Sequence, residues 1–387
     1  MTESEGARAQ LHQLLQAMVE SKASDMFVVA GAPVSFKIDG LMHPVTQQHM
    51  MPVMTRQLAE TLLNESQLVE FNRSHEFNLA YSIPALGRFR VNLFIQRNSV
   101  GIVIRTINTT IPAIDSLALP DIVKQLVLEK RGLILVVGGT GSGKSTSLAG
   151  MIGYRNQHTQ GHIITIEDPI EFVHAHGKSI ITQREVGTDT ESFEVALKNT
   201  LRQAPDVILI GEVRSRETME HAITFAETGH LCLSTLHANN ANQALDRIIN
   251  FFPEERKAQL LMDLSLNLRA IISQRLVPKQ SGKGRVAAIE VLINSPRMSD
   301  LIFSGQVHEM KSVMMENRDM GMQTFDQSLF DLYESQQISY ADALRFADAV
   351  NDLRLRIKLS SQRFAQEQPD TSAQDGINRF ELKPTQS

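Results

Sequence analysis

Residues 133–154 constrain the fold of this chain more than any other segment. An apolar run at 133–137 precedes the phosphate-loop pattern G-x-x-x-x-G-K-S/T at 138–145, and a helical pattern follows from Thr146. Glycines let the backbone N–H groups of such a loop converge on phosphate oxygens, and the helix N-terminus adds a partial positive charge. The segment therefore predicts a buried parallel strand, a nucleotide-binding turn and a helix.

The residues of this loop have separate expected roles. Lys144 is expected to reach the β- and γ-phosphates of a nucleotide, and the Ser145 hydroxyl is expected to bind Mg²⁺. A purely structural turn would match at every position and on both flanks only by coincidence. We expect the nucleotide to contact Gly138, Gly139, Thr140, Gly141, Ser142, Gly143, Lys144, Ser145 and Thr146.

Size and composition limit the class of protein. The 387 residues predict two or three domains, and the net charge of −5 gives no basic signal for nucleic acid. A single cysteine, Cys232, excludes an internal disulfide and a multi-cysteine metal site. The sequence shows neither a signal-peptide pattern nor an apolar run long enough to span a bilayer, so we expect a cytoplasmic protein.

The N-terminal part of the chain, residues 1–108, mixes helical and strand patterns and predicts a small α+β domain. Helical periodicity covers 55–71, and the strand expected over 88–95 alternates polar residues, Arg88 and Arg90 among them, with apolar ones. One face of the sheet in this domain is therefore expected to be polar.

The remaining chain predicts an α/β core followed by helices. In the core, short apolar strands alternate with helices, one of them expected over 256–274, which favours a mostly parallel sheet with helices on both faces. The last long helix is expected over 340–357. The linker, the core, the helical region and a polar tail without fixed structure are expected at 109–120, 121–294, 295–358 and 359–387.

Two strand ends in the core carry acidic residues. Glu212 follows the strand expected over 207–210, at the sheet edge where ligands bind, and is expected to hold Mg²⁺ or a magnesium-bound water. Another strand runs into the acidic segment 167–171, where Glu171 and Glu167 are candidates to orient or deprotonate the attacking water. On local sequence alone, an ordinary acidic loop residue and a solvated acidic turn stay open as alternatives.

Two histidines and two arginines are further candidates. His230 and His237 bracket a strand, and a histidine just past a strand end is able to sense a phosphate by hydrogen bonding. Arg90 and Arg105 lie on strands of the first domain and are candidates for fingers that act on a neighbouring subunit's nucleotide. Structural histidines and exposed strand charges are the alternatives.

Four motifs in this order resemble those of the secretion and type IV pilus ATPases. They are the Walker A loop, the Asp-box, the Walker B segment and the His-box, at 138–145, 163–171, 206–212 and 227–237. Within that superfamily the chain is most similar to the retraction ATPases PilT and PilU. The resemblance implies a PAS-like N-terminal domain, a RecA-like core and a ring-shaped hexamer, with nucleotide between one core and the next subunit's N-terminal domain.

The resemblance also implies ligands and roles. ATP and Mg²⁺ are the expected ligands, with Ser145 and the Walker B acid Glu212 toward the metal, and Glu171 becomes the catalytic glutamate. The residues that it implies for catalysis are Lys144, Glu171, Glu212, the His-box pair His230 and His237, and the N-terminal arginines Arg90 and Arg105.

Two features favour the PilU branch. A chain with one cysteine is unable to build the four-cysteine zinc element common in assembly-type and type II secretion ATPases. Residues 295–303 also lack the C-terminal signature of the PilT type, whereas 201–206 and 237–245 look like PilU. The resemblance implies a cytoplasmic homo-hexameric motor for pilus retraction and twitching motility. Such a motor lies at the inner membrane and works with a PilT-type retraction ATPase and the platform protein.

Two other functions stay open on the sequence. A RecA-like nucleic-acid motor shares the core chemistry, but the acidic balance and the scarcity of aromatic residues oppose it, so no nucleic-acid partner is expected. The second is a regulatory subunit that joins a PilT-type ring without hydrolysing ATP. The intact catalytic positions favour turnover instead.

Overall fold

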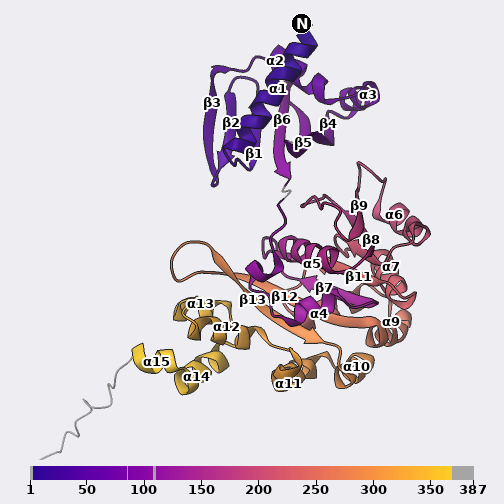
Figure 1. Cartoon of the computed structure of the whole chain (residues 1–387), viewed down its shortest axis with the longest axis vertical. Coiled ribbons are helices and arrows are strands. Elements are labelled where there is room, and N and C mark those ends of the chain that lie inside the picture. Colours follow the sequence, from indigo (N-terminus) through magenta and orange to yellow (C-terminus); the bar gives the residue numbers. More distant parts are fainter. Residues whose placement is uncertain (1–2, 85, 108–109, 368–387) are drawn as a thin grey trace, which may run out of the picture.

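The computed structural model describes residues 3–84, 86–107 and 110–367. Its two sheets stand in separate bodies, and the C-terminal helices continue from the second body (Figure 1). The elements of the first body are α1 (Glu3–Glu20), β1 (Asp25–Val29), β2 (Pro33–Ile38), β3 (Leu41–His49), α2 (Pro52–Leu62), α3 (Glu65–Ser74), β4 (Glu76–Ile83), β5 (Gly87–Gln96) and β6 (Ser99–Ile107).

The first body is a six-stranded antiparallel sheet with the order β3-β2-β1-β6-β5-β4. Apolar side chains of alternate strand residues, such as Val91 and Ile104, pack with those of α1 and α2 in one core. The helical periodicity over 55–71 belongs to two helices, because Asn64 caps the second one and accepts a hydrogen bond from the Gln67 N–H. Strand β4 was not predicted from the sequence pattern.

The opposite face of this sheet is polar. Arg90 on β5 pairs in register with Arg105 on β6, and Arg105 pairs with Asp25 on β1. Because paired residues point to the same side of a sheet, these three side chains lie together on the face that α1 and α2 do not cover. The predicted polar face is therefore present, and it carries both candidate arginines.

The second body is an α/β sheet with helices on both faces. Its elements are η1 (Ile114–Leu117), α4 (Ile122–Val127), β7 (Gly132–Val137), α5 (Lys144–His158), β8 (Gly161–Glu167), β9 (Ser179–Glu185), α6 (Phe193–Thr200), η2 (Leu201–Gln203), β10 (Val207–Ile210), α7 (Arg216–Glu227), β11 (Leu231–Leu236), α8 (Ala241–Asn250), α9 (Glu254–Asn267), β12 (Leu268–Pro278), β13 (Arg285–Ile293), α10 (Pro296–Phe303), η3 (Val307–Glu309), α11 (Met310–Glu316) and η4 (Arg318–Met320).

The seven strands have the order β13-β12-β7-β11-β10-β8-β9, and all pairs are parallel except β12 with β13. One apolar core lies between the sheet and α4 and α5, and another lies between the sheet and the helices from α6 to α11. The expected mostly parallel sheet with helices on both faces is confirmed. The parallel strands end at one edge, where the phosphate loop connects β7 to α5.

The helix expected over 256–274 is wrong from residue 268 onward. Helix α9 ends at Asn267, and Leu268 begins β12. Apolar residues there, such as Ile271 and Ile272, are buried in the sheet between β7 and β13. Pairing with two strands outweighs the local helical pattern, since a fully buried strand has no polar–apolar alternation to announce it.

The segment before α4 packs closely against α5. A Cβ atom built at Gly150 would lie 2.6 Å from Leu117 Cδ1, and one built at Gly153 would lie 3.0 Å from Ile111 Cγ2. The two glycines of α5 thus make room for residues 111–117, which the sequence places in the linker.

The C-terminal helices pack on the ends of β12 and β13. The single helix expected over 340–357 is two helices, because Asp326 accepts hydrogen bonds from the N–H groups of Asp348 and Ala349 at the break. The elements are α12 (Phe325–Glu334), α13 (Tyr340–Phe346), α14 (Val350–Ser360) and α15 (Gln362–Glu367).

The expectation of no fixed structure after residue 358 is wrong for residues 359–367. Arg363 of α15 is buried, and its guanidinium donates to the carbonyls of Tyr333 and Ile338 at 2.7 and 3.0 Å. These contacts hold α15 on α12. Residues 368–387 of the expected tail lie outside the described residues. In the part of the chain that the structure describes, no helix is long and apolar enough to cross a membrane.

Candidate active site

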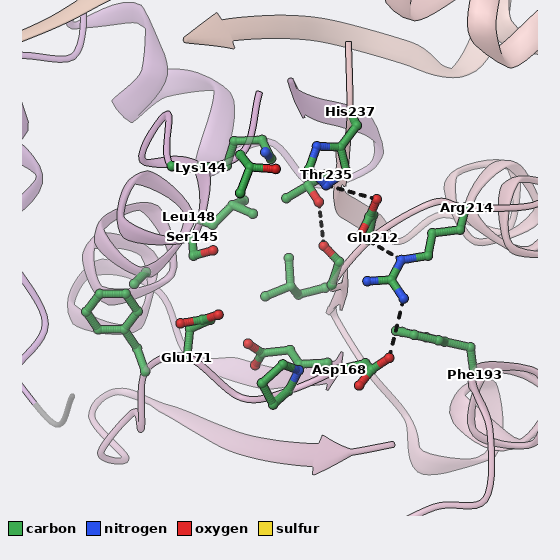
Figure 2. Close-up of a pocket in the computed structure, with 18 of the residues that line it drawn as sticks. Lys144, Ser145, Leu148, Asp168, Glu171, Phe193, Glu212, Arg214, Thr235 and His237 are labelled. Carbon is green, nitrogen blue, oxygen red and sulfur yellow. Dashed lines mark hydrogen bonds and ion pairs between the residues drawn. The ribbon is translucent and has the colours of Figure 1, made fainter. Parts of the chain in front are cut away.

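A cavity of about 270 Å³ opens at the carboxyl ends of the parallel strands. The phosphate loop and α5 form one side, and the segments that follow β8, β10 and β11 form the other (Figure 2). Its lining residues are Thr140, Gly141, Lys144, Ser145, Leu148, Ala149, Glu167, Asp168, Pro169, Glu171, Phe172, His174, Phe193, Leu209, Gly211, Glu212, Arg214, Thr235 and His237.

The phosphate loop is fixed by close approach to β12. A Cβ atom built at Gly138 would lie 2.6 Å from the carbonyl oxygen of Gln274, and one built at Gly143 would lie 2.7 Å from the Gln274 side-chain nitrogen. Gly143 has a φ of 91°, in the left-handed region that glycine tolerates. The sequence between β7 and α5 therefore needs glycine at both positions to bring the backbone into this cradle.

Lys144 lies across this cradle. Its Nζ donates to the carbonyls of Gly138 and Gly139 at 2.8 and 3.0 Å. Burial lowers the pKa of Lys144, and the attraction of Glu212 offsets part of that effect. The buried hydroxyl of Ser142 has no hydrogen-bond partner among the described residues. A polyanion in the cavity would supply acceptors to the Lys144 ammonium, because Lys144 lines the cavity.

Glu212 stands at the centre of a charged cluster on the other side of the cavity. It accepts from Arg214 Nε at 2.7 Å, and its second oxygen lies 3.3 Å from His237 Nε2. Arg214 also reaches Asp168 at 3.5 Å. The hydrogen bond to Glu212 raises the pKa of Arg214, so the guanidinium stays charged. The carboxylate that sequence reasoning assigned to Mg²⁺ is thus held in place by two neighbours.

The two candidate carboxylates at the end of β8 differ in burial: Glu167 is half-buried and Glu171 is exposed. Glu167 accepts hydrogen bonds from Thr165 at 2.8 Å and from Gln183 at 3.3 Å, and burial raises its pKa. Glu171 is exposed, and its side chain lines the cavity (Figure 2). Both candidates line the cavity, and Glu171 is the more exposed of the two.

A histidine beside this segment titrates far from its ordinary range. His174 lines the cavity and also a second one between α5 and residues 111–115. Burial lowers its pKa to about 4, so the ring is neutral at physiological pH. His174 therefore adds an uncharged wall between the two cavities.

His230 is not part of this cavity. It precedes β11, where its carbonyl accepts from the N–H of Gly132, the first residue of β7, at 3.0 Å. Its ring contacts Thr228 and the Phe225 carbonyl at 3.1 and 3.3 Å. His230 and His237 flank the two ends of β11. Because a strand rises about 3.3 Å per residue, they lie about 20 Å apart. His237 lines the cavity of its own chain and His230 does not, so the expected role of His230 in the His-box stays a prediction.

The two candidate arginines also stand apart from this cavity. Arg105 Nε donates to Asp25 Oδ1 at 2.7 Å, and the Arg105 side chain is 65% exposed. Neither Arg90 nor Arg105 is among the described residues that line the cavity of the same chain. Their expected action on a neighbouring subunit's nucleotide stays a prediction.

Several lining residues were missed in the sequence, and Arg214, Thr235 and Phe193 are examples. Arg214 follows Glu212 by two residues. An arginine this close to a strand-end carboxylate is a sequence signal from which an ion pair at the site could have been predicted. Thr235 donates to the Gly211 carbonyl at 2.6 Å, and Phe193 begins α6. Nothing in the local sequence separates Phe193 from an ordinary core residue, because its place on the cavity depends on the packing of α6.

The fold and the cavity define a RecA-like P-loop ATPase. The chain belongs to the family described as type II/IV secretion system protein, whose model matches residues 2–300, and within it to the PilT and PilU group of type IV pilus ATPases.

Two relatives from Pseudomonas aeruginosa support this placement. The type IV pilus ATPase PilU is 60% identical over 353 residues, which cover 91% of this chain and 92% of the relative. The retraction ATPase PilT is 40% identical over 331 residues, which cover 86% and 96%.

A solved structure supports the fold. The pilus retraction motor PilT with bound ADP superimposes with a TM-score of 0.83 at 41% identity, over 89% of this chain and 98% of that one. The predicted family and fold class are confirmed, and the nucleic-acid motor is not favoured.

Proposed function

We propose that this chain is an ATP-hydrolysing motor subunit for type IV pilus retraction and twitching motility. One observation carries the proposal: the phosphate loop faces Glu171 and Glu212 across a single cavity, in a chain with 60% identity to a type IV pilus ATPase. Carboxylates on both sides of a phosphate site are what hydrolysis needs, because one orients water and the other supports the metal.

Each residue has a task in this proposal. Lys144 exchanges the Gly138 and Gly139 carbonyls for the β- and γ-phosphate oxygens of ATP. Glu171 orients the attacking water and accepts its proton, since it is exposed in the cavity, whereas the other exposed acid, Asp168, pairs with Arg214. His237 lies against Glu212 and contacts the terminal phosphate once nucleotide is bound.

The site suits Mg²⁺ held jointly by the protein and the nucleotide. Ser145 and Glu212 would hold the ion, which supplies neutralisation of the charge that develops on the phosphates. No group of three or more His, Cys, Asp or Glu residues in the described chain is arranged to hold a metal ion alone. Phosphate oxygens therefore have to complete the coordination, so the metal arrives with ATP.

The proposal extends to the assembly. Arg90 and Arg105 lie away from the cavity of their own chain and on an uncovered polar face, where a neighbouring subunit's nucleotide is within reach in a ring. We propose a homo-hexamer in which these arginines complete the adjacent site. The ring acts in the cytoplasm at the inner membrane, with the pilus platform protein and a PilT-type ATPase as partners and no nucleic acid.

Steady-state hydrolysis of Mg-ATP by the purified chain tests the proposal. We expect Lys144→Ala and Glu171→Gln each to lower kcat at least about 100-fold, because each removes a group that acts at the reacting phosphate. Only Lys144→Ala should also weaken ADP binding. The control is Glu254→Gln, which changes an exposed carboxylate far from the cavity.

Two results contradict the proposal. Absent hydrolysis would favour the regulatory subunit that joins another ring, and full hydrolysis in both variants would place the chemistry elsewhere. A deletion strain, alone and beside a deletion of the PilT-type gene, tests the biological part. Loss of twitching motility that the wild-type gene restores and the Glu171→Gln gene does not is the expected result.

A further inference from the structure

A buried charged cluster joins the C-terminal helices to the loop after β11. Asp348, at the junction of α13 and α14, accepts from Arg275 of β12 at 2.5 Å and from Lys311 of α11 at 2.8 Å. The side chains of Asp348 and Arg275 are only 11% and 20% exposed. Arg275 also stacks on the ring of Phe325, with its guanidinium carbon 3.9 Å from the ring centroid.

The same cluster holds the backbone and side chains of residues 239–241. Arg275 donates to the Asn239 carbonyl at 3.1 Å, and the Asn240 amide donates to Asp348 at 3.2 Å. The N–H of Ala241 donates to buried Glu290 at 2.8 Å. Three consecutive residues at the start of α8 are therefore fixed by groups from β12, β13 and the C-terminal helices.

This loop begins at His237. The imidazole lies 3.3 Å from Glu212 and lines the cavity, and only Ala238 separates it from Asn239. A segment this short transmits a displacement of its anchored end to its first residue, because each peptide unit is planar and rigid. The position of His237 against Glu212 thus depends on the anchor at residues 239–241.

Strand β12 reaches both sides of the site. Side chains alternate along a strand, so Gln274 points away from the face that carries Arg275. Gln274 accepts from the Ser147 hydroxyl at 2.7 Å and lies against Gly143 of the phosphate loop. Two adjacent residues of one strand therefore brace the phosphate loop and the His237 loop.

We propose that Asp348 and Arg275 are positioning residues for His237, through which the C-terminal helices set the geometry of the hydrolytic cavity. The consequence for turnover rests on the proposed ATP hydrolysis, whereas the positioning itself does not. Asp348 neutralises Arg275 and Lys311 and binds Asn240, so a shift of α13 and α14 moves the start of α8. A partner that displaces these helices changes the rate of hydrolysis without touching nucleotide.

Hydrogen–deuterium exchange of the full chain tests the positioning. Asp348→Asn weakens the cluster, and Asn240→Ser keeps a side chain that caps α8 while it removes the amide that binds Asp348. We expect peptides covering 237–245 to exchange about 10-fold faster in both variants, with α10 unchanged. The control is Asp331→Asn, which breaks the exposed pair with Arg318 in the same helical region.

Kinetics test the consequence for the site. We expect both variants to lower kcat about 10-fold with the KM for ATP within about twofold, because only the geometry around the reacting phosphate changes. In a His237→Ala background, Asp348→Asn should lower kcat less than about twofold further, since both changes act through one residue. A purely structural role predicts equal losses in both backgrounds.

The outcomes are distinct. Unchanged exchange at 237–245 in Asn240→Ser, or equal kcat losses with and without His237, overturns the inference. If Asp348→Asn melts below the assay temperature, Asn240→Ser decides alone. If the wild-type chain does not hydrolyse ATP, the proposed function fails, and the exchange experiment still decides whether Asp348 positions the loop.

Discussion

Gly138 shows how a single residue sets the shape of the cradle. The carbonyl of Gln274 lies where a side chain at this position would begin. A backbone oxygen yields less readily than the end of a flexible side chain, so the phosphate loop itself would have to move. The phosphate-loop pattern predicts a glycine at position 138. The sequence does not show that close approach of β12 requires this glycine.

Gly138→Ala should weaken ADP binding at least about 10-fold, because the added methyl group displaces N–H groups that must converge on phosphate. Isothermal titration with ADP measures the effect. Gly229→Ala is the matched control, since Gly229 also has positive φ, 97°, but has no atom within 4 Å of its Cβ position. Its affinity should stay at the wild-type value. Equal affinity in Gly138→Ala would contradict the close approach of Gln274.

His174 should make the melting temperature of the protein sensitive to mild acid. Its pKa is lowered from 6.5 to about 4 by burial, so the unfolded chain binds a proton that the folded chain refuses as the pH falls below 6.5. This contribution to stability is complete above pH 6.5 and is lost on the way to pH 4. At pH 5.5 the loss is on the order of 1 kcal/mol.

Melting curves between pH 7.5 and pH 5 measure this effect. The melting temperature of the wild type should fall more steeply than that of His174→Asn, in which the titrating ring is gone. His308→Asn, at a histidine whose side chain is 80% exposed, serves as the control and should follow the wild type. Parallel curves for all three proteins would show that His174 takes up its proton in the folded state as well.

At the scale of elements, the sequence predicts what depends on neighbours along the chain. The strand–loop–helix unit at the phosphate loop, the strand ends at Glu171 and Glu212, and the alternation on β5 follow from local pattern and agree with the structure. Strand β12 does not, because residues 270–274 are buried on both faces without a regular polar–apolar alternation and form a strand by pairing with β7 and β13. The cluster around Asp348 was beyond prediction for the same reason.

The capping box of α12 should be worth a measurable part of the stability of the helical region. The side chain of buried Thr324 accepts from the Gln327 N–H, and the Gln327 side-chain oxygen accepts from the Thr324 N–H at 3.0 Å. Thr324→Ala should destabilise the protein by about 1–2 kcal/mol, whereas Thr324→Ser keeps the hydroxyl and most of the stability. Urea unfolding compares the two. An alanine variant as stable as the serine variant would show that the box is dispensable.

At the scale of the whole molecule, the cavity and the two candidate arginines lie on different bodies of the chain. The first body carries Arg90 and Arg105 on a polar face. All described residues that line the cavity belong to the second body. Asp25 is buried and holds Arg105 by its Nε, which orients the rest of the guanidinium. Whether these arginines contact the nucleotide of their own chain or of another depends on how subunits assemble. A single sequence therefore predicts the residues but not the nucleotide that they contact.

Mixing inactive subunits tests whether the arginines act on a neighbour. Arg105→Ala and Lys144→Ala should each lose most hydrolysis as pure proteins. A mixture regains part of it if Lys144 of one subunit meets Arg105 of the next. The matched control mixes Arg105→Ala with Arg90→Ala, in which no N-terminal body carries both arginines. Activity of the first mixture equal to the sum of its parts would place the arginines in their own subunit's chemistry or outside it.

The packing of residues 111–117 on Gly150 and Gly153 gives α5 a second task. One end of this helix carries Lys144 and Ser145, and its middle supports the segment that leads toward the N-terminal body. With a rise of about 1.5 Å per residue, Lys144 and Gly153 are only about 14 Å apart along α5. Because glycine has no side chain, residues 111–117 pack directly on the backbone of α5. A tilt of α5 would therefore displace residues 111–117 as well. The start of α5 at the phosphate loop and the segment 111–117 are therefore linked by direct packing on one helix.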